Sequence, residues 1–241
     1  MSESPTNDRP RNSESWAKPV STLTVTDAPA DAPNLVDGKR LLSPIQGFGK
    51  MWQKTYKAPL HGIETTPEAV IAAWRDDFPS FWPQGNDFYP PLTGLEPGEV
   101  ALIKAAGPGG MKFKTGVMVL YSDDVSFTLM TPEGHMFAGW ITFSAHDEDG
   151  VTVAQTQVLM RAQDPLSEMG LAMGGHRMEN RFWEQTLRNL AAHLGVENAK
   201  VSTLVTCVDR RRQWSKATNV KNSVAIRSTL HLLKPGAKSS R

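Results

Sequence analysis

Two pairs of ionisable residues have the side-chain types that acid–base chemistry needs. Glu133 and His135 stand on either side of a glycine in the run TPEGH, and His176 and Glu179 open a helix-like run after two glycines. A general acid or base must come within about 3 Å of the proton that it transfers, with a pKa moved by burial. Turn formers surround the first pair and favour solvated side chains there, and His176 is equally typical of a helix start. His135 and Glu133 remain the catalytic candidates, with Asp164 as a further acid.

Other kinds of reactive centre are not indicated. The six histidines are dispersed, and no Ser/His/Asp set or His/Cys cluster has the spacing of a nucleophile or a metal site. The run GPGGMK lacks the Lys-Ser or Lys-Thr that opens a helix in a phosphate loop, and it predicts a hairpin turn instead. We therefore predict neither a metal nor a cofactor.

Aromatic side chains point to ligand binding. Residues 78–92 carry five aromatics among four prolines, which excludes a regular helix or a central strand but makes exposure costly. This connection is predicted to pack over one opening of the core, either as a plug or as a lid that contacts a ligand. The binding candidates are the aromatics of this connection, of the predicted sheet and of the predicted long helix: Phe81, Trp82, Phe88, Tyr89, Phe127, Trp140 and Trp183.

Two amides could orient a ligand among these apolar walls. In the strand-like run over residues 151–160, Gln155 and Gln157 share one face, and Ala154 and Val158 share the other. If the glutamine face is internal, each amide needs a hydrogen-bond partner from a ligand, a water or the backbone. If it is the solvent face, the alanine and valine point inward. The alternation fits both assignments.

The elements that must position these residues follow from hydrophobic periodicity. Residues 117–160 read as four antiparallel strands joined by turns at 122–124, 131–134 and 146–150, and further strands are predicted at 50–57, 99–106 and 201–208. A short helix begins after Thr66, and a long helix-like segment covers 164–194 with a kink at its two adjacent glycines and Gly195 as its C-cap. A curved sheet that grips one long helix leaves a cavity between them.

Composition divides the chain into three parts. Residues 1–37 are rich in Ser, Thr, Pro and Asp and predict a disordered leader, residues 38–208 a ligand-binding domain, and residues 209–241 a basic extension. The single cysteine, Cys207, fits a reducing compartment, and no secretory leader or membrane span is indicated, so we expect a cytoplasmic protein.

The basic extension has an electrostatic character of its own. From residue 200 onward the chain has 10 Lys and Arg against one Asp. Arg210, Arg211 and Arg212 with Trp214 have the composition of a contact with an anionic membrane surface or a nucleic acid. Solvated charge, or folding back onto the acidic domain, would explain the same residues.

The order of these elements resembles the START-like helix-grip superfamily, which includes polyketide cyclases and dehydratases, lipid-transfer domains and plant ligand-binding allergens. The strand Lys50–Lys57, the run TPEGHMFAGWITFSA at Thr131–Ala145 and the helix GGHRMENRFWEQTLRNLAAHLG at Gly174–Gly195 carry the resemblance, which spans about residues 48–196. The chain is also similar to small uncharacterised actinobacterial proteins of this superfamily, a similarity that brings no activity with it.

The resemblance implies an α+β fold in which a curved antiparallel sheet wraps around a long C-terminal helix. It also implies an elongated cavity that binds or transports a small hydrophobic molecule or lipid. One alternative is an enzyme of the cyclase or hydrolase type, using His135 with Glu133 or Gln155 in the same cavity. Another is an adaptor that contacts an anionic surface through its basic extension.

Overall fold

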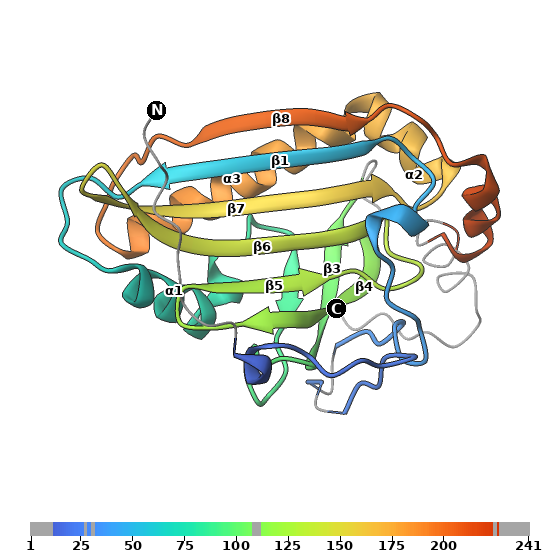
Figure 1. Cartoon of the computed structure of the whole chain (residues 1–241), viewed down its shortest axis with the longest axis horizontal. Coiled ribbons are helices and arrows are strands. Elements are labelled where there is room, and N and C mark those ends of the chain that lie inside the picture. Colours follow the sequence, from blue (N-terminus) through green and yellow to red (C-terminus); the bar gives the residue numbers. More distant parts are fainter. Residues whose placement is uncertain (1–11, 27, 30–31, 108–111, 224–225, 227–241) are drawn as a thin grey trace.

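The structure is a computed structural model that describes residues 12–26, 28–29, 32–107, 112–223 and 226. Its centre is one eight-stranded antiparallel sheet in the order β2-β3-β4-β5-β6-β7-β1-β8, curved around a long helix (Figure 1). The strands are β1 (Met51–Pro59), β2 (Asp87–Tyr89), β3 (Val100–Ala106), β4 (Lys112–Ser122), β5 (Ser126–Met130), β6 (Phe137–Glu148), β7 (Val151–Ala162) and β8 (Ser202–Asp209). The predicted α+β helix-grip fold, with its central meander, is confirmed.

Three helical segments follow one another on the concave side of the sheet. They are α2 (Pro165–Gly170), the π-helical turn η5 (Leu171–Gly175) and the long α3 (His176–His193). The side chain of Asp164 caps α2 by accepting from the amides of residues 166 and 167. The predicted kink is confirmed, because Gly174 has a φ of 114°, in the left-handed region that favours glycine. Gly195, with a φ of 94°, ends the run as predicted.

Shorter helices close the ends of the grip. Helix α1 (Pro67–Asp76) packs against β6 at one end, and the 3-10 turn η3 (Phe78–Phe81) leads into the short edge strand β2. The 3-10 helices η2 (Pro44–Gln46) and η6 (Trp214–Asn222) lie at the end of the sheet where α2 is found. The 3-10 helix η1 (Ser13–Ser15), in dark blue, lies below the sheet in the view of Figure 1. Within the described ranges, no helix combines the length and the apolar character that crossing a membrane requires.

Residues 12–26, 28–29 and 32–37 of the segment predicted as a disordered leader are described, and they contact the sheet. Leu23 and Val36 are each only 2% exposed and pack on the convex face of β3 and β4. Trp16 forms a bridge with Tyr121, and their ring centroids are 4.7 Å apart. The segment needs few apolar residues because the sheet supplies the other half of the apolar contact. Residues 1–11 of the predicted leader lie outside the described residues.

Candidate functional site

Aromatic side chains fill the centre of the grip. Phe78, Phe127 and Phe143 are fully buried, and the centroids of the last two rings are 4.8 Å apart in a stacked pair. Trp82 lies 5.1 Å from Phe88 and 6.3 Å from Trp183, which in turn contacts Phe143 at 5.6 Å. Phe81, at 2% exposed, belongs to the same cluster. The aromatic connection is therefore a plug, and the rings expected to line a cavity pack on one another instead.

Four of the predicted binding residues lie on the other side of the sheet from α3. Side chains alternate along a strand, so Trp140 faces away from its buried neighbours Ile141 and Phe143. Tyr89 packs with the N-terminal segment on the convex face. Gln157 donates to Thr55 Oγ1 at 3.2 Å, and Gln155 approaches Ser144 at 3.5 Å. These side chains cannot contact a ligand held between the sheet and α3.

The predicted catalytic pair is used to build a turn. His135 is 9% exposed, and its Nδ1 accepts the amide proton of Phe137 at 2.9 Å. Burial lowers the pKa of His135 to about 4, so the ring is neutral near pH 7. Glu133 accepts from Asn222 at 2.9 Å and pairs with Arg40 at 3.5 Å. Neither residue belongs to the lining of the two pockets described below.

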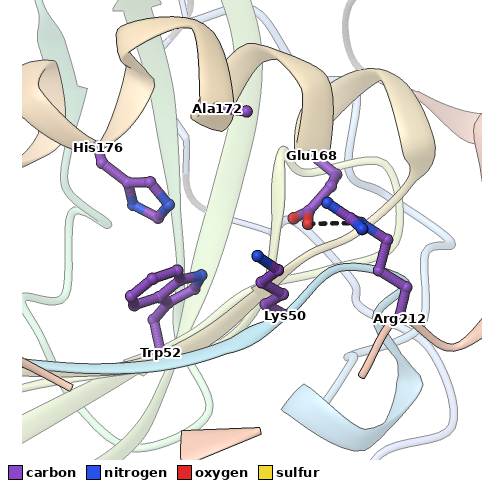
Figure 2. Close-up of a pocket in the computed structure, with 6 residues that line it drawn as sticks. All are labelled: Lys50, Trp52, Glu168, Ala172, His176 and Arg212. Carbon is purple, nitrogen blue, oxygen red and sulfur yellow. Dashed lines mark hydrogen bonds and ion pairs between the residues drawn. The ribbon is translucent and has the colours of Figure 1, made fainter. Parts of the chain in front are cut away.

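A pocket of about 140 Å³ opens at the α2 end of the grip, between β1 and the helices above it (Figure 2). Lys50 and Trp52 rise from the strand side, and His176 descends from the start of α3. The complete lining is Lys50, Trp52, Glu168, Ala172, His176 and Arg212. A site with one aromatic wall and several charged groups suits a small molecule with both apolar and polar parts.

Local sequence explains how the two walls come together. The alternation of β1 directs Trp52 and Lys54 toward α3, and Lys50, directly before the strand, lines the same pocket as Trp52. Gly49 lets α2 approach closely, because a Cβ at this position would lie 2.3 Å from Glu168 Oε2. The glycine therefore allows the Glu168 carboxylate to rest against the strand.

Arg212 reaches the pocket from the chain that follows β8. Its Nε donates to Glu168 Oε1 at 3.0 Å (Figure 2). This part of the chain is held by the amide of Gln213, which donates to the carbonyl of Phe48 at 2.7 Å. It is also held by Arg161, which donates to the carbonyl of Arg211 at 2.8 Å. One carboxylate of the pocket is thus already neutralised from within.

Two other polar groups of the pocket, on Lys50 and His176, are available to bind a ligand. Lys50 has no hydrogen-bond or ion-pair partner among the described residues, and its ammonium group points into the space between the walls. The ring of His176 meets Trp52 edge to face at 4.7 Å, and its buried Nδ1 has no partner in the described part of the chain. Burial and then the charges of Lys54 and Lys50 lower the pKa of His176 to about 4. Near pH 7 the pocket therefore carries one uncompensated positive charge.

A closed polar network lies farther along the same face of β1. Lys54 is fully buried and donates to Glu179 Oε2 at 2.6 Å and to Asn180 Oδ1 at 2.9 Å. The hydroxyl of Tyr56 donates to the same amide oxygen at 2.9 Å. Burial raises the pKa of Glu179 while the nearby Lys54 ammonium opposes that shift. These groups satisfy one another and fasten α3 to β1, beside the pocket and outside its lining.

The predicted anionic-partner contact is divided between two roles. Arg212 lines the pocket, and Arg211 pairs with Asp209 at 3.1 Å. Arg210 is exposed, and Trp214 is 74% exposed with one edge-to-face contact to Phe48 at 5.2 Å. Two of the three arginines thus form ion pairs within the protein.

A second depression lies at the opposite end of β1 and has a larger volume of about 310 Å³. It is lined by Lys57, Pro59, His61, Glu148, Asp149, Val151, Val153 and Ser202. Its lysine is already paired with Glu148. We regard the smaller pocket as the functional candidate because it holds a cation without a partner.

The sequence reasoning did not single out Lys50, Trp52, Glu168 or Ala172, and it assigned Arg212 to a different partner. A signal existed in and directly before β1, where Lys50 and Lys54 alternate with Trp52 and Tyr56 at every second position. Lysines that alternate with aromatics on a face turned to the core are costly unless they are paired or functional. Arg212 carried no such signal, because its place depends on how the chain crosses back over β1.

Comparisons with known proteins give similarity of structure only. No protein-family model matches the chain, and no curated protein matches it. The similar solved structures include protein Ms6760 from Mycobacterium smegmatis, with 16% identity over 59% of this chain and 90% of that one at a TM-score of 0.42. Protein NE0264 from Nitrosomonas europaea has 14% identity over 59% and 94% at a TM-score of 0.41. Ara h 8.0201 has 12% identity over 60% and 97% at a TM-score of 0.41. The function is therefore argued from the site alone.

Proposed function

We propose that the protein binds a small molecule with an apolar body and one anionic group, such as a carboxylic acid, in the pocket at the α2 end of the grip. The observation that carries this proposal is the Lys50 ammonium group, which points into the pocket without an acceptor among the described residues. A carboxylate placed there would make a charge-assisted hydrogen bond, the stronger kind.

The other lining residues support the same class of ligand. The ring of Trp52 and the methyl group of Ala172 offer apolar surface to the body of the molecule. Arg212 spends only its Nε on Glu168, which leaves the end of its guanidinium group for a ligand oxygen. The ligand fits as a short molecule, because the aromatic cluster fills the centre of the grip. A long lipid chain would have to remain outside.

The test compares charged and neutral probes of the same shape. Isothermal titration calorimetry would measure the affinity of the full chain for benzoate and hexanoate against benzamide and hexanamide. Replacing Lys50 by methionine keeps most of the side-chain volume and removes the charge. We expect Lys50→Met to weaken carboxylate binding roughly 10- to 100-fold, the value of one charge-assisted hydrogen bond.

Lys57→Met is the matched control, because Lys57 is near the far end of β1, lines the other depression and pairs with Glu148. Its affinity for the carboxylates should equal that of the wild type. The proposal is wrong if neither carboxylate binds, if amides bind as well as acids, or if the two lysine variants behave alike. In those cases the pocket would be a solvated notch on a compact scaffold.

A further inference from the structure

The outer surface of the helices above the pocket carries exposed large apolar side chains that do not contribute to the core. Leu166 and Met169 on α2, Met173 on η5 and Met178 on α3 are 38%, 54%, 79% and 49% exposed. They lie within thirteen residues of continuous chain. Together with Arg177 and Arg181, which are also exposed, we call them the methionine patch. An exposed group of large apolar side chains with a polar rim is the signature of an interaction surface.

A local change in backbone conformation exposes part of this patch. Met173 has left the helical region, with φ −87° and ψ 23°, directly before the left-handed Gly174. The π-helical turn thus directs the most exposed methionine outward while Ala172, its neighbour, lines the pocket. Such turns are frequent at functional sites.

The charges around the patch have one sign. The only acids of residues 165–181 are Glu168 and Glu179, and both turn inward to Arg212 and Lys54. Arg177 and Arg181 have no ion pair within the described part of the chain. The outer surface therefore joins apolar side chains to uncompensated positive charge.

We infer that the methionine patch docks on an anionic lipid surface. A partly apolar, partly basic helical surface buries its apolar side chains at the headgroup boundary, and each arginine gains from the negative surface potential. A protein groove could cover the methionines, but the arginines favour a partner with many negative charges. Docking would place the pocket beside the lipid surface, since Ala172 of the pocket lining directly precedes Met173 of the patch. The inference is independent of the proposed ligand.

Vesicle co-sedimentation tests the inference with the full chain. One set of vesicles would contain equal amounts of phosphatidylserine and phosphatidylcholine, and the other phosphatidylcholine alone. We expect binding to the first set, weakened by salt, and little binding to the second. Arg177→Ser combined with Arg181→Ser should lower the partition coefficient roughly 10- to 30-fold. Met169→Ser combined with Met173→Ser should also lower it several-fold, since less apolar area is buried.

The control replaces Leu204 and Val208 of β8 by serine, because both are exposed apolar residues outside the patch. This variant should bind like the wild type. Circular dichroism melting confirms that each variant is folded, and benzoate titration confirms that the pocket is intact. No binding to phosphatidylserine vesicles, or binding that survives either pair of patch substitutions, would overturn the inference. Failure of the benzoate experiment alone would leave it standing.

Discussion

Burial decides the roles of the ionisable residues. Lys54 is fully buried and His135 is 9% exposed, but the two side chains are accommodated in different ways. Lys54 is paired with Glu179 and has a second acceptor on Asn180. His135 gives up its charge, because its Nδ1 lone pair is occupied by the Phe137 amide and no carboxylate is bonded to it among the described residues. A buried ionisable group must be paired or neutral.

The neutrality of His135 predicts a pH-dependent stability. The folded protein holds its pKa at about 4, whereas the unfolded chain has the ordinary value of 6.5. Below about pH 6.5 the unfolded chain therefore gains a proton that the folded protein does not accept until about pH 4, and the free energy of unfolding falls across this window. The contribution of His135 is up to about 3 kcal/mol. Urea unfolding at a series of pH values would measure it.

His135→Asn should flatten part of this dependence, since its side-chain oxygen can accept the Phe137 amide proton without titrating. His176, whose pKa is also lowered to about 4, would keep the remainder. His61→Asn is the control, because His61 is exposed. An unchanged pH profile in His135→Asn would show that burial of this ring does not govern acid sensitivity.

Close approach of α2 to β1 is the element-scale feature that forms the pocket. Glu168 rests against Gly49, and Arg212 closes over Glu168 from the other side. A side chain at position 49 would meet Ala162 Cβ at 2.8 Å as well as the carboxylate at 2.3 Å. The backbone of β7 stands behind Ala162, so the strand side cannot yield and the Glu168 carboxylate on α2 must be displaced.

Gly49→Ala should therefore lower the free energy of unfolding by about 1–3 kcal/mol, the usual cost of overpacking. It should also change benzoate affinity, because Glu168 lines the pocket and holds Arg212 there. Gly170→Ala is the matched control: Gly170 is helical and has no atom within 4 Å of a new Cβ. That variant should gain about 0.5–1 kcal/mol from helix propensity. Chemical denaturation compares the two, and equal effects would contradict the packing argument.

At the scale of the whole molecule, the sheet is covered on its concave face and, over β3 and β4, on its convex face as well. The concave face holds the aromatic cluster and α3, and the convex face of β3 and β4 holds the segment that contains Leu23 and Val36. A sheet with only one covered face would leave Val100, Leu102 and Met118 in water. The N-terminal segment is thus part of the fold.

Leu23→Ala should cost about 2–3 kcal/mol of unfolding free energy, as is usual for a buried leucine. Leu23 is 2% exposed, whereas Val20 in the same segment is 49% exposed and serves as the control. Val20→Ala should change stability by less than about 0.5 kcal/mol. If thermal or denaturant unfolding shows the same small effect for both variants, the segment does not stabilise the domain.

Periodicity in the sequence was enough to predict the hairpins and the kinked helix, because period-two runs cut by turn formers and a three-to-four repeat arise from local geometry. The helix-grip architecture was implied by the resemblance of the order of these elements to the superfamily. It could not decide which face of β7 meets α3, since alternation defines two faces without naming the covered one. It also could not tell that Phe78, Phe127 and Phe143 fill the grip, which depends on side-chain volumes in three dimensions. The pocket joins Lys50, Glu168 and Arg212, which are far apart in the chain. Only the tertiary structure brings them together, because β8 runs antiparallel to β1 and ends beside the start of β1.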